Sequence, residues 1–172
     1  MRGYYGPLRF QTMTMSETHA SALLEPVRAA ADSAGVFAAV ELAGDLLRCR
    51  ALGSAEEAWY RVRREEGRWF VELVTADRWL SESIEADLMH YGDPIEELVE
   101  EELVEIEEAR GGSHRGQPAV QHFRSEDRLY TFRTPMSGPG EAAEPAATIN
   151  MLLAYEAAFR RLGDMSAAPD AD

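Results

Sequence analysis

No lysine occurs in this sequence of 172 residues, and all 17 basic residues are arginines. A P-loop nucleotide site needs its lysine beside the phosphates. Protein kinases and penicillin-binding enzymes need a lysine in their signature motifs. Pyridoxal and other Schiff-base enzymes need an amine that only lysine supplies. These four classes of enzyme are therefore excluded.

Cysteine and long apolar runs are also scarce. Cys49 is the single cysteine, so no disulfide can form within the chain, and a reducing cytoplasm is the expected location. No apolar run approaches the ~18 residues that span a bilayer, and the first residues lack the apolar core of a signal peptide. We expect a disordered leader at 1–15, with Met15 as an alternative start, a single domain at 16–164 and a loose tail at 165–172.

Negative charge is abundant but confined to one part of the chain. The formal net charge is −14, and residues 77–108 contain 13 acidic residues against one arginine. The remaining chain is almost balanced, with 18 acidic residues and 16 arginines. Nucleic acid and anionic membrane surfaces are not expected as partners, because both require a basic surface.

Strands are predicted by alternating apolar and polar residues in three hairpins. The first two pair 36–42 with 46–52 and 58–64 with 68–75, through turns that contain Gly44 and Gly67. The third pairs 119–124 with 128–134. Sequential strands usually pair, so an antiparallel arrangement is the simplest one.

Four helices are predicted by apolar residues at helical spacing. The first covers 16–34, and Pro26 means that it either kinks there or begins near Glu25. Asp77 can cap the second, which ends at Gly92. For the third, we expect Asp93 as the N-cap, Pro94 as the first helical residue and Glu96 completing a capping box. The last helix is expected at 146–162, with Gly163 as its C-terminal cap.

The resulting order is α-ββββ-αα-ββ-α. Strands and helices do not alternate strictly, which favours an α+β fold with an antiparallel sheet flanked by helices over a parallel α/β sheet.

Two sets of charged residues are candidates for binding a partner. The third helix has a solvated acidic face or a docking surface for a basic protein. Alternating arginines on predicted strands form a platform for acidic peptides, or they make ordinary ion pairs with Glu41 and Glu72 on neighbouring strands. They can also dock on the acidic helices of a partner subunit. The candidate residues are Glu97, Glu100, Glu101 and Glu105 on the helix, and Arg48, Arg50, Arg61 and Arg63 on the strands.

Catalytic and metal-binding patterns are weak in comparison. No histidine falls in a zinc motif, and we expect neither a metal nor another cofactor. Ser113 and His114 form the one tempting nucleophile–base pair, but they are neighbours in a glycine-rich loop. His122 is expected to be a packed or surface ring, and Cys49 a buried thiol facing the core. The chain is therefore more easily interpreted as a binding protein than as an enzyme.

The segment RLYTFRT followed by ATINMLLAYEAAFRRLG resembles the closing part of class I type III secretion chaperones and their YbjN-like relatives. The element order, the small size and the low pI are similar as well. This resemblance implies a bacterial, dimeric α+β protein that binds an extended segment of a partner.

Three functions follow as hypotheses. The first is a non-enzymatic, chaperone-like homodimer that binds a segment of a partner protein through its sheet and apolar helix faces. The second is an acidic decoy or inhibitor that presents residues 77–108 to a basic protein. The third is an enzyme of unrecognised type. The apolar surface of the last helix is the reason for expecting a homodimer.

Overall fold

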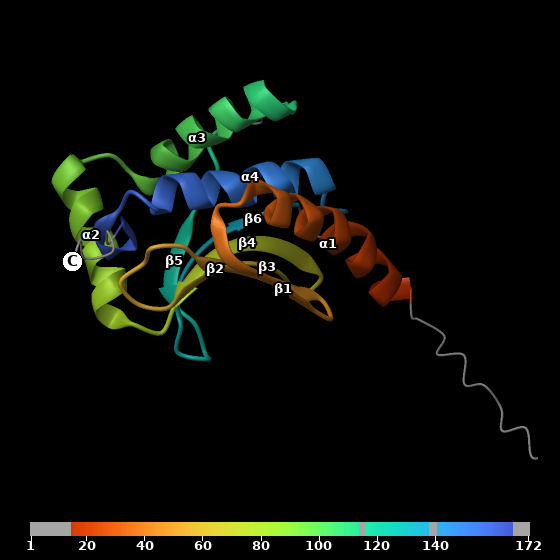
Figure 1. Cartoon of the computed structure of the whole chain (residues 1–172), viewed down its shortest axis with the longest axis horizontal. Helices are drawn as coiled ribbons and strands as arrows, with labels where there is room; N and C mark the ends of the chain where they lie inside the picture. The colour runs from red at the N-terminus through yellow and green to blue at the C-terminus, as the bar shows by residue number, and fades with distance from the viewer. Residues whose placement is uncertain (1–14, 114–115, 138–140, 167–172) are drawn as a thin grey trace, which may run out of the picture.

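The computed structural model describes residues 15–113, 116–137 and 141–166, and it is an α+β fold with an antiparallel sheet, as predicted (Figure 1). The predicted leader at 1–15 lies outside these residues except for Met15. In chain order the elements are α1 (Met15–Ala34), β1 (Phe37–Ala43), β2 (Leu46–Ala51), β3 (Ala58–Glu65), β4 (Arg68–Thr75), α2 (Arg78–Tyr91), α3 (Ile95–Arg110), β5 (Gln121–Arg124), β6 (Tyr130–Pro135), α4 (Pro145–Phe159) and a short 3-10 helix, η1 (Gly163–Ser166).

The sheet has six strands in the order β1-β2-β3-β4-β6-β5, and all neighbours are antiparallel. The first four strands form a meander with tight turns at Gly44 and Gly67, whose φ angles of 62° and 77° suit glycine. The last hairpin then adds β6 beside β4, which makes β5 an edge strand.

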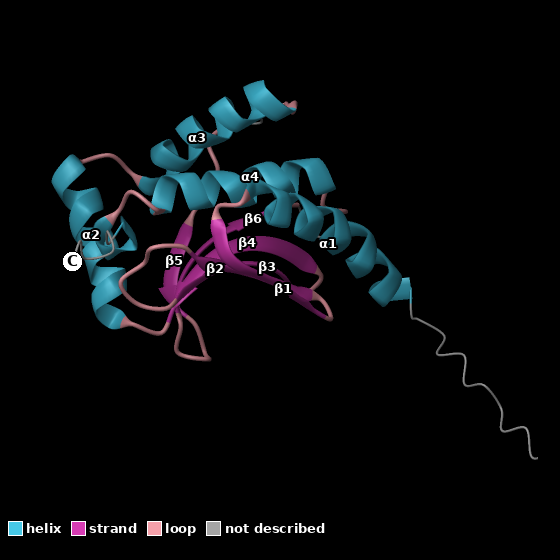
Figure 2. Ribbon diagram, in the orientation of Figure 1, coloured by secondary structure: helices cyan, strands magenta, loops and turns pink. Residues whose placement is uncertain are grey.

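Helices cover one face of this sheet. Figure 2 shows α1 and α4 lying on the sheet, with α3 stacked on α4 as an outer layer. α1 packs on β1 and β2, and α4 packs on β3 and β4. α2 stands at one end of the sheet and contacts η1. None of the described helices covers the opposite face, which we call the open face.

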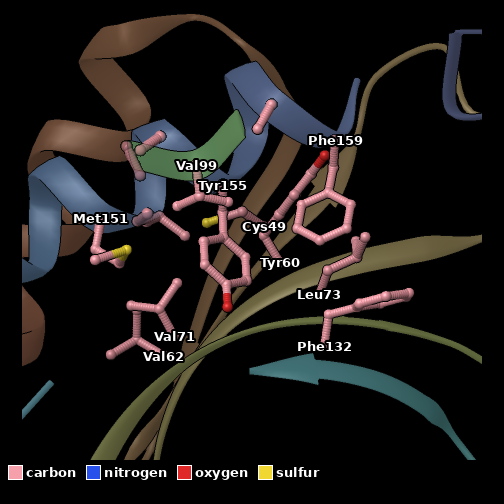
Figure 3. Close-up of a cluster of buried hydrophobic side chains, with 14 of the residues drawn as sticks. Cys49, Tyr60, Val62, Val71, Leu73, Val99, Phe132, Met151, Tyr155 and Phe159 are labelled. Atoms are coloured by element: carbon pink, nitrogen blue, oxygen red, sulfur yellow. The ribbon is translucent and has the colours of Figure 1, made fainter. Parts of the chain in front are cut away.

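The core fills the space between the sheet and the helices (Figure 3). Its largest buried side chains include Tyr60, Tyr155 and Phe159, and Phe132 and Phe159 have ring centroids 5.1 Å apart. Val99 of α3 adds to this core from the outer helix layer. One covered and one open face explain the alternation of β2 and β3, whereas β4 in the middle of the sheet is buried on both faces.

Helix ends differ from the expectations at several points. α1 runs through Pro26, which is exposed, without beginning at Glu25. The capping box predicted for α3 is wrong: Pro94 is extended, with φ −68° and ψ 148°, and no side chain caps the helix. Asp93 therefore lies too far before the first helical residue to cap it. Asp77 does cap α2, through a 2.7 Å hydrogen bond from the Leu80 amide.

The C-terminal end of the last helix was also predicted incorrectly. α4 ends at Phe159, and Gly163 begins η1 where we expected a helix cap. Met165 of η1 is buried, at 1% exposure. Residues 167–172 of the predicted tail lie outside the described residues.

The apolar surface of α4 is used inside the chain. Ten residues of this helix are buried, by the sheet on one side and by α1 and α3 on the others. The surface that suggested a homodimer is therefore not available to a second copy.

Candidate functional site

The four predicted arginines share the open face. Arg48 and Arg50 alternate on β2 with buried Leu47 and Cys49, while Arg61 and Arg63 alternate on β3 with buried Tyr60 and Val62. Arg48 lies directly opposite Arg61 in the β2–β3 register. Because successive side chains of a strand point to opposite faces of the sheet, these arginines lie on the same face, as the sequence indicates. Arg133 of β6 joins them, and it was missed because its strand is distant in the sequence.

Most of these arginines are ion-paired within the sheet. Arg61 donates two hydrogen bonds to one oxygen of the buried Glu72, at 2.7 and 3.0 Å. Arg48 pairs with Glu41 at 2.6 Å on an exposed edge. The ordinary cross-strand pairs considered above are therefore present. A single row crosses all six strands, made of Glu41, Arg48, Arg61, Glu72, Arg133 and Gln121.

Arg50 differs from its neighbours. It is exposed, and no ion pair joins it to any residue that the structure describes. It lies beside Trp59 in the β2–β3 register. Its guanidinium is therefore available to a carboxylate from outside the chain.

Aromatic rings lie among the arginines of the open face. The Arg48 guanidinium lies 4.8 Å from the Trp59 ring centroid. Arg133 contacts two rings, with its guanidinium 4.3 Å from Phe70 and 4.7 Å from Phe123. Such contacts keep the planar guanidinium groups in place over apolar surface.

A hollow of about 220 Å³ opens on this face beside Trp59, and we call it the Trp59 hollow. The indole and hydroxyl donors of its wall are already hydrogen-bonded: the Trp59 indole donates to Glu57 at 2.8 Å, and the Thr75 hydroxyl donates to the Glu57 carbonyl at 2.8 Å. What remains is an apolar site for about one side chain, rimmed by guanidinium groups. The lining residues are Leu46, Arg48, Glu57, Trp59, Arg61, Val74, Thr75, Ala76 and Leu129.

The predicted acidic residues lie elsewhere. Glu97, Glu101 and Glu105 are exposed on α3, and Glu100 is half-buried. Because α3 is the outer layer on the helix side, these carboxylates and the open face lie on opposite sides of the molecule (Figure 1). The structure therefore does not bring the two predicted sets together.

Exposed apolar side chains are concentrated on α2. Trp79, Met89 and Tyr91 are 73%, 85% and 63% exposed. Single exposed apolar residues are ordinary, but three on one 14-residue helix are not. Sequence reasoning missed them because the buried stripe of α2 was easier to recognise than its opposite face.

A larger cavity of about 800 Å³ lies where α3, α4 and β6 meet. Leu103, Met136 and Met151 form apolar parts of its wall. The wall is held by a 3.0 Å hydrogen bond from Asn150 to the Gly111 carbonyl. This cavity is not predictable from the sequence, because its wall combines two loops with residues far apart in the chain.

A hydrogen-bond relay runs from the buried Tyr155 to Thr134, which is part of that wall. The Thr134 hydroxyl donates to the Ala119 carbonyl at 2.9 Å, so Tyr155 donates to Thr134 at 2.7 Å. Burial raises the pKa of Tyr155 above its ordinary range, which keeps this phenol protonated. The protonated phenol therefore acts here as a hydrogen-bond donor to Thr134.

The candidate catalytic groups are not assembled in the described residues. Ser113 lines the large cavity, while His114 lies outside the described residues. The His122 ring stacks on Phe132 at 3.8 Å, with Nε2 2.8 Å from a Glu85 carboxylate oxygen. Cys49 is fully buried, and burial raises the pKa of its thiol to about 12. The thiol faces the core, as predicted, and both its burial and its raised pKa disfavour the reactive thiolate.

Two further features are absent from the described part of the chain. No group of three or more metal-ligating side chains is present there. No described helix is long and apolar enough to cross a membrane.

Comparisons with protein-family models, with curated proteins and with solved structures give no match for this chain.

Proposed function

We propose that this protein is a non-enzymatic binding module whose open face binds a segment of a partner protein. The observation that carries this proposal is the Trp59 hollow, an apolar site rimmed by Arg48 and Arg61 on a sheet face that none of the described helices covers. A flat charged sheet would give only weak, exposed ion pairs. A hollow also lets a partner side chain be buried away from water, as the central residues of specific interfaces are.

The chemistry of the face selects an acidic segment with an apolar residue. Its apolar side chain enters the Trp59 hollow, while a neighbouring carboxylate meets Arg50. Because Arg50 has no ion pair with the described residues, this contact requires no internal pair to break. Binding of an extended segment is also what the resemblance to class I type III secretion chaperones implies.

An array of synthetic peptides tests the proposal. Each peptide carries glutamates and one leucine at a different spacing, and a matched array replaces glutamate with lysine. We expect labelled protein to bind some acidic peptides and none of the basic ones. Anisotropy titrations of the best peptide then compare Arg50→Glu with Arg28→Glu, which reverses an exposed arginine on α1.

Arg50→Glu should weaken binding by tenfold or more, and Arg28→Glu should leave it nearly unchanged. Trp59→Ala should also weaken binding, because it removes one wall of the hollow. Absence of any acidic-peptide binding would reject the proposal, as would equal effects of the two arginine reversals.

A second candidate function is an acidic decoy or inhibitor that presents residues 77–108 to a basic protein. The observation that favours it is the set of exposed apolar side chains on α2, beside the densest negative charge of the chain. In this case we expect the protein to bind the lysine peptides, and Glu101→Arg to weaken that binding. The affinity should also fall steeply as the salt concentration rises.

A further inference from the structure

We infer that the segment bound by the open face is α2 of a second copy, so that two chains form a homodimer with reciprocal contacts. This inference rests on the proposed function of the open face as a binding surface. In each contact, one exposed apolar side chain of α2 enters the Trp59 hollow of the other chain. Carboxylates on the same helix meet arginines at the rim.

The helix α2 has the composition that the open face selects. Trp79, Glu82, Ala86 and Met89 follow the spacing of one helical stripe, so a single docking helix can present them all. Trp79 and Met89 are among the most exposed large apolar residues of the described chain. The Glu82 side chain is 40% exposed and pairs with exposed Arg78, a pair that solvent screens.

The hollow fits this occupant in size and polarity. About 220 Å³ accommodates one side chain such as methionine, and the walls include Leu46, Val74 and Leu129. Methionine adapts well to an irregular apolar site. Removing Met89 and Trp79 from water is the driving force, and Arg48 and Arg50 set the orientation through charge.

The position of α2 favours a closed dimer. Ala76 lines the Trp59 hollow, and α2 begins two residues later at Arg78. The helix and the hollow are thus neighbours on the surface. Two adjacent complementary patches can pair twice about a twofold axis, which closes the assembly at two chains.

The acidic face of α3 is a poorer occupant. It lies on the side of the molecule away from the open face, so its docking would join chains head to tail. Such contacts continue into rings or filaments. α3 also lacks large exposed apolar side chains, whereas α2 has three.

Light scattering coupled to size exclusion tests the inference on the whole chain over a range of concentrations. The helix variant carries Trp79→Ser and Met89→Ser, and the face variant carries Arg48→Glu and Arg50→Glu. All four positions are exposed, so circular dichroism should show both variants folded. Leu52→Ser is the matched control, because Leu52 is 60% exposed and belongs neither to α2 nor to the lining of the Trp59 hollow.

We expect the natural chain and the control to reach a constant mass of two chains. Each variant alone should be monomeric, because its reciprocal dimer loses both contacts. An equimolar mixture should again form dimers at higher concentration, because the intact helix of the face variant fits the intact face of the helix variant. Dimers that form only in the mixture are expected only if α2 of one chain contacts the open face of the other.

Three results would overturn the inference: a monomeric natural chain at every concentration, a dimer that both variants leave intact, or a mass that keeps growing with concentration. These outcomes are separate from the peptide test. A monomer that binds acidic peptides through Arg50 refutes the α2 dimer and leaves the proposed function standing. Absence of both peptide binding and self-association refutes both.

Discussion

Replacing Glu72 should destabilise the protein strongly, because Glu72 is a buried carboxylate with a single arginine as its main partner. Glu72 is 1% exposed, and the Arg61 side chain is 11% exposed. Removing one member of a buried pair leaves the other charge without compensation, at a cost of about 3–5 kcal/mol. For Glu72→Leu, this corresponds to a fall in Tm of about 6–20 °C in a domain of this size.

Urea unfolding followed by tryptophan fluorescence measures this free energy. Replacing both partners, as Arg61→Leu with Glu72→Leu, should recover most of the loss, since no unpaired charge remains. The exposed pair is the control: Glu41→Leu should cost about 1 kcal/mol or less, because Arg48 and Glu41 are nearly half exposed. A Glu72→Leu variant within about 1 kcal/mol of the natural protein would refute the reasoning, as would a double variant as unstable as the single one.

Three other outcomes are expected. Asp77→Ala removes the α2 cap and should cost about 1 kcal/mol in thermal unfolding, whereas no loss would show that the cap is dispensable. Gly163→Ala should cost about 2–4 kcal/mol, because φ is +49° and the new Cβ would lie 2.5 Å from the Ser83 carbonyl carbon and 2.7 Å from the Ile84 amide nitrogen. Cys49 should not react with Ellman's reagent at pH 8 until urea unfolds the chain, since burial raises the pKa of its thiol to about 12; rapid reaction in the native state would contradict this.

Local structure was predictable where neighbouring residues decide it. Gly44 and Gly67 occupy turns that require positive φ, and Gly92 ends α2 with φ 79°. Asp77 caps the helix that follows it. In each case the physical cause acts within about four residues, so a single sequence contains the whole signal.

Other local patterns were overruled by the rest of the chain. The apparent capping box at Asp93 and Glu96 does not form, because Pro94 stays extended and α3 begins at Ile95. Met165 follows a glycine and an aspartate, which suggests a tail, yet it packs in the core. The backbone there is held by α2, since the Gly163 amide donates to Asp87 and the Asp164 amide donates to Ser83.

The sequence by itself determined the α+β class, the exclusion of lysine-dependent enzymes and the shared face of Arg48, Arg50, Arg61 and Arg63. These follow from composition and from the two-residue period of a strand, which act within one segment. Only the tertiary structure decided that β6 lies beside β4, which places Arg133 next to Glu72, and that α3 lies on the side opposite the arginines. It also decided that the apolar surface of α4 is buried in the core and that the Trp59 hollow exists. Those arrangements depend on contacts between distant segments, which no local period records.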